Sequence, residues 1–228
     1  MAKEKDLFYL MQMAGGTFPS GGFSQSWGLE TYVAEGRIKD EADFIMFAES
    51  YLESAVACCE GPIAIKAMRL AADWDDQGIE ELEELSIAVK VVKESRESSL
   101  RMGKAFMRIM ADITEDERLL EFRAGRMAEG VTYPVIYGAV CGRLGIDETE
   151  AVKAFVFSTV NALSQSAVKL IPLGNRQAQQ ALLRLYPAME EAVRISFETS
   201  VEDISNFCPG LDIAGILHEY LPTRLYMS

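Results

Sequence analysis

The chain contains one histidine, His218, in a sequence of 228 residues. Catalysis by a histidine dyad and metal binding by a histidine-rich site are therefore excluded within a single chain. A lone histidine next to Glu219 in a helical C-terminal segment is typical of an exposed or capping residue rather than of a general base. From this scarcity we expect no catalytic residue, no metal site and no cofactor.

Cysteine is also scarce, with four residues at Cys58, Cys59, Cys141 and Cys208. They are too few and too irregular for a disulfide framework in a chain this long, and such usage is typical of the reducing cytosol. Adjacent side chains on a helix point about 100° apart, which disfavours a soft metal site at Cys58 and Cys59. We interpret both as small buried hydrophobic residues.

Long apolar runs and an excess of positive charge are both absent. The most apolar segment, residues 154–163, contains three polar residues and is about half of the roughly 20 residues that a membrane span requires. No secretion signal is recognisable. Twenty-two Lys and Arg face 35 Asp and Glu, which gives a net charge of −13. Because an acidic surface repels phosphate backbones, we expect no nucleic-acid partner. The cysteine usage, the missing secretion signal and the short apolar segment together predict a cytoplasmic protein that does not bind a membrane.

Helical periodicity is present almost everywhere. Hydrophobic residues make up 49% of the chain and recur at intervals of three and four, and no stretch alternates long enough for a strand. The expected helices cover residues 41–59, 63–74, 79–113, 117–127 and 148–171, the last of them central. Their expected signals are caps at Asp40 and Asp147, a break at Gly61-Pro62, a capping box at Thr114-x-x-Glu117 and a later kink or split at Pro187. The sequence predicts an all-α fold, a single globular bundle of about eight to ten helices over residues 1–228.

The expected helix over residues 79–113 is small and polar in its middle. Ser95, Ser99 and Gly103 stand where Leu or Val would normally be found, so either the helix bends or another backbone approaches it closely. Helix propensity favours a solvated kink. The acidic run at residues 73–84 is interpreted as a solvated surface rather than as a hard-metal site.

A glycine-rich segment over residues 15–26 has no Gly-Lys-Ser/Thr ending and no preceding strand, so we reject nucleotide binding by this loop. Ser24 is expected to cap a short helix that Gly36 closes. Gly28, inside that helix, indicates the close approach of a neighbouring element. Three aromatic residues of this region are either core residues or an interface patch, with the core favoured: Phe18, Phe23 and Trp27.

A break at Pro209-Gly210 precedes a C-terminal segment with an apolar stripe. Such a segment either packs on its own domain or awaits a partner. The stripe consists of Ile213, Ile216, Leu217, Leu221 and Leu225.

Five segments, taken in order, resemble the urease accessory protein F (UreF) family over nearly the whole chain. They are FPSGGFSQSWGLE (18–30) with Gly36 after it, RESSLRMGKAF (96–106), Tyr133-Pro134-Val135 with Gly138, IPLGNRQAQQALL (171–183) and LDIAGILHEYLPTRLYMS (211–228). Three positions depart from the usual family pattern, namely Gln25, Asn175 and Ala178.

The resemblance implies a helical homodimer that takes part in nickel delivery to apo-urease and has no substrate chemistry of its own. In that family the protein bridges a second accessory protein, called D or H, and the nickel-carrying GTPase, called G. The C-terminal tail, about 209–228, is implied to dock on the D-type protein. The candidate partner-binding residues are Phe23, Trp27, Glu30, Arg176, Gln179, His218, Glu219, Arg224 and Tyr226. The candidate structural residues are Pro19, Gly22, Gly28, Gly36, Gly103, Pro172 and Gly174.

Two hypotheses from different classes remain open. In the first, the protein is a non-catalytic assembly factor of urease maturation, which we favour. In the second, it is a GTPase-activating subunit that supplies an arginine in trans, with Arg224, Arg176 and Arg101 as candidates, because an inserted guanidinium stabilises transferred phosphoryl charge. A single-turnover GTP hydrolysis assay on the partner GTPase separates the two.

Overall fold

The computed structural model describes residues 2–126 and 129–227, and within these ranges every regular element is a helix. This confirms the predicted all-α class. In chain order the elements are α1 (Ala2–Ala14), η1 (Gly22–Ser24), α2 (Leu29–Ala34), α3 (Glu41–Tyr51), η2 (Leu52–Glu60), α4 (Gly61–Asp73), α5 (Asp76–Ala88), α6 (Lys93–Thr114), α7 (Glu117–Gly125), α8 (Tyr133–Arg143), α9 (Glu148–Leu170), α10 (Asn175–Glu198), η3 (Val201–Asp203) and α11 (Pro209–His218).

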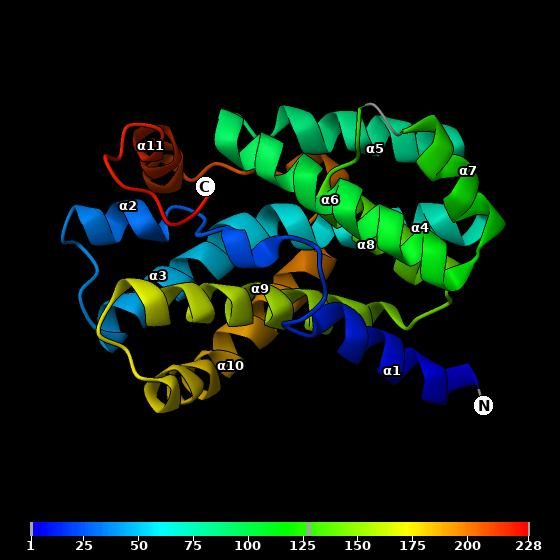
Figure 1. The fold of residues 1–228 in the computed structure, drawn as a ribbon. Helices are drawn as coiled ribbons and strands as arrows, with labels where there is room; N and C mark the ends of the chain where they lie inside the picture. The colour runs from blue at the N-terminus through cyan, green and yellow to red at the C-terminus, as the bar shows by residue number, and fades with distance from the viewer. Residues whose placement is uncertain (1, 127–128, 228) are drawn as a thin grey trace.

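The helices pack around α9, which contacts α1, α2, α3, α4, α8 and α10 (Figure 1). This confirms its predicted central position. Helix α1 lies at one end of the molecule, and α11 lies at the other end beside α2, close to the C-terminus (Figure 1). Within the described residues, no helix has an apolar stretch of the length needed to cross a bilayer.

At two places a helix approaches a neighbouring backbone so closely that a side chain would not fit: α8 against α4, and α6 against the loop before α8. A Cβ built on Gly138 of α8 would lie 2.2 Å from the carbonyl oxygen of Ala64 in α4, and one on Gly142 would lie 2.2 Å from that of Met68. On α6, a Cβ at Gly103 would lie 1.9 Å from the carbonyl oxygen of Val131. The small residues in the middle of α6 therefore admit a neighbouring backbone, and the favoured interpretation of this region as a solvated kink is wrong.

The expected break at Gly61-Pro62 is also wrong. Helices α3 and α4 form one continuous rod through η2, a π-helical stretch in which the Gly61 N–H donates to the carbonyl of Val56, five residues back. Pro62 sits in the first turn of α4. Since proline has no N–H to donate, the change from π to α hydrogen bonding leaves no donor unpaired at this position.

The boundaries of α5, α6 and α7 differ from the expected ones. Residues 79–113 are two helices rather than one, separated at residues 89–92. The capping box at Thr114 does not form, because the Thr114 hydroxyl donates to the carbonyl of Met110 within α6. Asp116 caps α7 instead, accepting from the Leu119 N–H at 3.0 Å. The predicted caps at Asp40 and Asp147 are confirmed.

Pro187 does not split its helix, since α10 runs as one element past it. Cys59 is fully buried, as interpreted, whereas Cys58 is only half-buried. The acidic run at residues 73–84 is largely exposed, but Glu83 is buried and accepts hydrogen bonds from the Thr132 N–H and hydroxyl. The interpretation of a solvated surface is wrong for that residue, because α5 turns this face toward α8.

Candidate partner-binding site at the C-terminal tail

Helix α11 packs against both α2 and α6. Gly28, which precedes α2 with a φ of +88°, lies under it, and a Cβ built there would lie 3.3 Å from the Cβ of Ala214. The predicted close approach at Gly28 is confirmed, although the residue lies at the N-cap of the short helix rather than inside it. Ser24 is part of η1 and does not cap α2.

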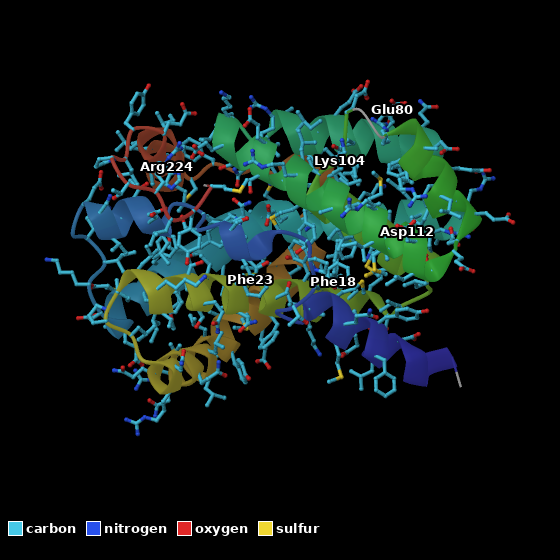
Figure 2. All side chains as sticks on the ribbon, in the orientation of Figure 1. Phe18, Phe23, Glu80, Lys104, Asp112 and Arg224 are labelled. Carbon is cyan, nitrogen blue, oxygen red and sulfur yellow. The ribbon has the colours of Figure 1, made fainter. Side chains whose placement is uncertain are left out.

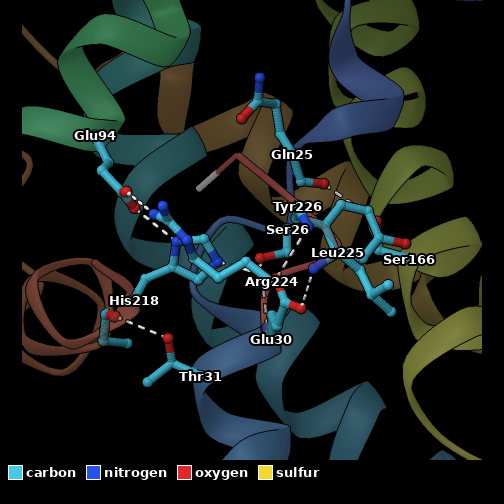
Figure 3. A network of polar contacts seen from close by, with 11 residues as sticks. Gln25, Ser26, Glu30, Thr31, Glu94, Ser166, His218, Arg224, Leu225 and Tyr226 are labelled. Atoms are coloured by element: carbon cyan, nitrogen blue, oxygen red, sulfur yellow. Dashed lines mark hydrogen bonds and ion pairs between the residues drawn. The ribbon is translucent and has the colours of Figure 1, made fainter. Parts of the chain in front are cut away.

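His218 is the centre of a buried polar network that joins three elements (Figure 3). Its Nδ1 lies 2.7 Å from Oε2 of Glu94 on α6, and its Nε2 lies 3.0 Å from Oε2 of Glu30 on α2. The side chain is completely shielded from solvent. The expectation of an exposed or capping histidine is therefore wrong, because two carboxylates from distant segments enclose the ring and satisfy both nitrogens.

The residues after α11 return across the same network. Glu30 accepts from the backbone N–H groups of Leu225 and Tyr226 at 2.7 and 3.1 Å, and Glu94 accepts from Arg224 at 3.0 Å. Arg224 lies beside α11 at this end of the molecule (Figure 2). The tail thus packs on its own domain, one of the two outcomes that its apolar sequence allowed.

Further contacts hold the middle of α11 and the last residues of the tail. The Thr31 hydroxyl donates to the carbonyl of Ala214 at 2.9 Å, and the Met227 N–H donates to the carbonyl of Ser24 at 2.8 Å. Tyr226 is 5% exposed and packs near Lys169. Among the candidate residues, Glu30, His218, Arg224 and Tyr226 are therefore brought together.

The outer surface of the tail carries large hydrophobic side chains, whereas the inner surface buries small residues and the polar side chain of His218. Helix α11 buries Ala214, Gly215 and His218 and turns several large hydrophobic side chains to solvent. Ile213 is 56% exposed, and Tyr220 just beyond the helix is 77% exposed. The remaining exposed hydrophobic residues of the tail region are Phe207, Ile216, Leu217, Leu225 and Met227. These seven residues are called the tail face below.

A small polar cavity of about 60 Å³ lies under the tail. Lys90 and Glu60 form a buried ion pair at 2.9 Å on its wall, and the Ser98 hydroxyl has no partner among the described residues. Burial opposes the charge of Lys90, but Glu60 outweighs it, so the pKa of Lys90 is raised. Burial also raises the pKa of Asp212, another residue of the wall. A space of this size holds a few water molecules rather than an organic ligand.

The other candidate partner-binding residues lie apart from the network. Phe23 is 42% exposed, Trp27 is half-buried against the ring of Tyr51, and Glu219 is exposed at the end of α11. Arg176 and Gln179 are exposed on the first turns of α10. Phe18 is buried against Phe106, so the two phenylalanines of the glycine-rich segment separate into a core residue and a surface residue (Figure 2).

The candidate structural residues are mostly turn positions. Gly36 closes α2 with a φ of +69°, as predicted, and Gly174 precedes α10, where its N–H donates to the side chain of Gln177. Gly22 begins η1, and Pro19 and Pro172 are exposed in loops. Gly103 lies at the α6 contact described above.

Sequence reasoning missed Glu94, which contacts both His218 and Arg224 in the network. Glu94 stands in the first turn of α6, where an acidic residue is usual because it favours the positive end of the helix dipole. Nothing in the local sequence distinguishes it from an exposed residue in the same position. Among the described residues, no group of three His, Cys, Asp or Glu side chains converges on a point that could hold a metal ion.

Comparison with known proteins supports the family resemblance that the five sequence segments indicate. A sequence model of the UreF family matches residues 38–186. The chain is 33% identical over 225 residues to the urease accessory protein UreF of Bacillus sp. (strain TB-90), covering 97% of this chain and 99% of that protein. It is 32% identical over 202 residues to the UreF protein of Sporosarcina pasteurii, covering 88% and 100% of the two chains. The chain therefore belongs to the UreF family of urease accessory proteins.

Proposed function

We propose that this protein is a non-catalytic assembly factor of urease maturation, acting in the cytoplasm as a homodimer. It bridges the D/H-type accessory protein and the nickel-carrying GTPase G while nickel is inserted into apo-urease. Nickel is the cargo of the assembly and not a resident cofactor of this chain. Family membership supports the role in urease maturation, and the tail face supports the bridging step.

The bridging proposal rests on which side chains of α11 face solvent and which are buried. A helix at the surface of a monomer normally turns its apolar side inward, whereas α11 turns polar His218 inward and Ile213 and Ile216 outward. Several large exposed hydrophobic side chains on one short segment are typical of a protein–protein interface. We assign the D-type protein to the tail face, while residues 1–208 form the helical body that supports it.

The test is a double substitution on the tail face, Ile213→Asp with Ile216→Asp. Both side chains are more than half exposed, so the fold is expected to remain intact while co-purification with the D-type protein falls at least tenfold. Met46→Asp is the matched control, because Met46 is 61% exposed on α3, away from the tail. Equal co-purification of the double variant and the control would contradict the assignment.

A GTPase-activating role remains a second candidate, and one observation favours Arg176 as its arginine. Arg176 is exposed at the start of α10 and makes no hydrogen bond or ion pair with any described residue. Arg224 is bound to Glu94 at 3.0 Å, and Arg101 pairs with Glu97 at 3.7 Å. A free guanidinium is the one best able to reach a phosphoryl group on a partner.

Single-turnover GTP hydrolysis by the partner GTPase, with and without this protein, tests the second candidate. An arginine supplied in trans would accelerate hydrolysis by about a thousandfold or more, and Arg176→Ala would abolish the acceleration. An unchanged rate with wild-type protein would leave the assembly factor as the only function of the two.

A further inference from the structure

The ring of His218 sits between two carboxylates, and each of its nitrogens contacts one carboxylate oxygen. Nδ1 lies 2.7 Å from Glu94 and Nε2 lies 3.0 Å from Glu30. A hydrogen bond at each contact requires one hydrogen between nitrogen and oxygen. Two contacts therefore require two hydrogens, whereas a neutral imidazole facing two ionised carboxylates supplies only one.

Both carboxylates accept hydrogen bonds from further donors besides the ring. Glu30 accepts from the N–H groups of Leu225 and Tyr226, one on each oxygen. The second oxygen of Glu94 accepts from the guanidinium of Arg224 at 3.0 Å. Charged and backbone donors of this kind favour the ionised acid. The missing hydrogen is thus carried by the ring, and the docked site contains one imidazolium.

The charge balance of the site depends on that proton. The charged groups that face the ring are Glu30 from α2, Glu94 from α6 and, beyond Glu94, Arg224 from the C-terminal segment. With the proton present, the two carboxylates are balanced by the ring, which is buried, and by Arg224, whose side chain is 43% exposed. Without it, a buried site retains one uncompensated negative charge, which is costly in a low-dielectric surrounding.

We propose that His218 is a proton-operated latch: uptake of one proton closes the tail onto α2 and α6, and loss of that proton releases it. The latch acts on the tail face, so its consequence for partner binding rests on the proposed function. Releasing the tail lets α11 and the returning segment move, and the D-type protein must then reorder them on binding. By linkage, the docking equilibrium falls by up to about tenfold for each pH unit once the ring loses its proton.

The single histidine makes the test direct. Uniform labelling of histidine with ¹⁵N gives one pair of ring signals, which reports the charge of His218 in the full-length protein. Amide exchange of Leu225 and Tyr226 reports docking, because both N–H groups donate to Glu30. We expect protection of these amides and the imidazolium signal to be lost together as the pH rises. Amides that stay protected after the ring has become neutral would overturn the latch.

Glu94→Gln is the variant that separates the latch from the rest of the network. Its amide oxygen can still accept from Arg224 while its NH₂ group donates to a neutral Nδ1, so the docked tail no longer needs the extra proton. Protection of Leu225 and Tyr226 is then expected to become independent of the ring charge. Glu97→Gln is the matched control, because Glu97 is an exposed carboxylate of the same helix, and it should behave as wild type. If Glu94→Gln fails to fold, the latch is tested by the wild-type protein alone, through the ring charge of His218 and the amide protection of Leu225 and Tyr226 measured across pH.

Binding of the D-type protein at several pH values distinguishes this inference from the proposed function. If ring charge and amide protection change together but no binding occurs at any pH, the latch stands and the proposed function fails. If binding occurs and its affinity falls as the latch opens in wild type but not in Glu94→Gln, both stand. Binding that is equally strong with the tail docked and released would overturn the role of the latch in partner binding.

Discussion

At the crossing of α4 and α8 two backbones touch because Gly138 and Gly142 carry no side chain, whereas at the tail α11 is held by charged hydrogen bonds around His218. The crossing lies in the hydrophobic core, and the tail lies at the edge of the molecule (Figure 1). Close apolar packing has no titratable group, and its strength does not depend on pH. The strength of a charged network can depend on pH, so the two regions are expected to respond differently when the pH changes.

The largest effect is expected at the crossing. Gly138→Ala would place a Cβ 2.2 Å from the carbonyl oxygen of Ala64, so the two helices must move apart at a cost of about 3 kcal/mol. Chemical denaturation measures the free energy of unfolding. Gly125→Ala at the end of α7 is the control, because no atom lies within 4 Å of the new methyl group. Equal stability of the two variants would show that the crossing is looser than described.

Glu30→Gln should loosen the tail and leave the crossing intact. An amide has only one oxygen for the three donors that Glu30 now satisfies, so the docking free energy should fall by about 2 kcal/mol, or about 30-fold in the equilibrium. Amide exchange at Tyr226 measures the loss. Glu35→Gln, an exposed residue at the end of the same helix, should have no effect. A global loss of protection in Glu30→Gln would mean that the two regions are not separable.

The pH dependence of unfolding refines the comparison, because one buried carboxyl does lie near the core helices. Burial raises the pKa of Glu83 from 4.5 to about 7, although hydrogen bonds from Thr132 oppose this. A protonated Glu83 can donate to the Thr132 hydroxyl at 2.6 Å, and that hydroxyl can in turn donate to Ser86 at 2.8 Å.

The sign of this dependence follows from which state holds the proton. Between pH 4.5 and 7 the folded protein keeps a proton on Glu83 that the unfolded chain has released, so the free energy of unfolding should fall by about 3 kcal/mol as the pH rises through that range. Denaturation at several pH values measures the slope, and Glu83→Gln should make it flatter. A wild-type slope retained in the variant would assign the dependence to other groups.

The smallest effect is expected at an exposed ion pair. Arg101 and Glu97 are both nearly half exposed on α6, with 3.7 Å between the charged atoms. Such pairs contribute about 0.5 kcal/mol or less, so Arg101→Ala should change neither the melting temperature nor the protection of the tail. A change of several degrees would indicate that α6 transmits strain from its surface to the close backbone contact between Gly103 and Val131.

Part of the site could be predicted from the sequence, and part could not. Glu30, His218, Arg224 and Tyr226 were found through their resemblance to family segments, but their joint burial was not. Glu94 was missed because it resembles any acidic residue in a first helical turn. Trp27 and Phe23 could be identified from the sequence as core or interface candidates, but their environments could not. Trp27 packs on Tyr51, whereas Phe23 is partly exposed to solvent.

The helical class and several helix ends follow from local sequence, because periodicity and capping depend on residues within about four positions of each other. Asp40, Asp147 and Gly36 act as their local sequence indicates. The burial of His218 depends instead on tertiary packing, because its partners Glu94 and Glu30 are 124 and 188 positions away. Tertiary packing also decided that Gly103 meets a backbone and that the apolar side of α11 faces outward, since both depend on which distant element packs against the helix.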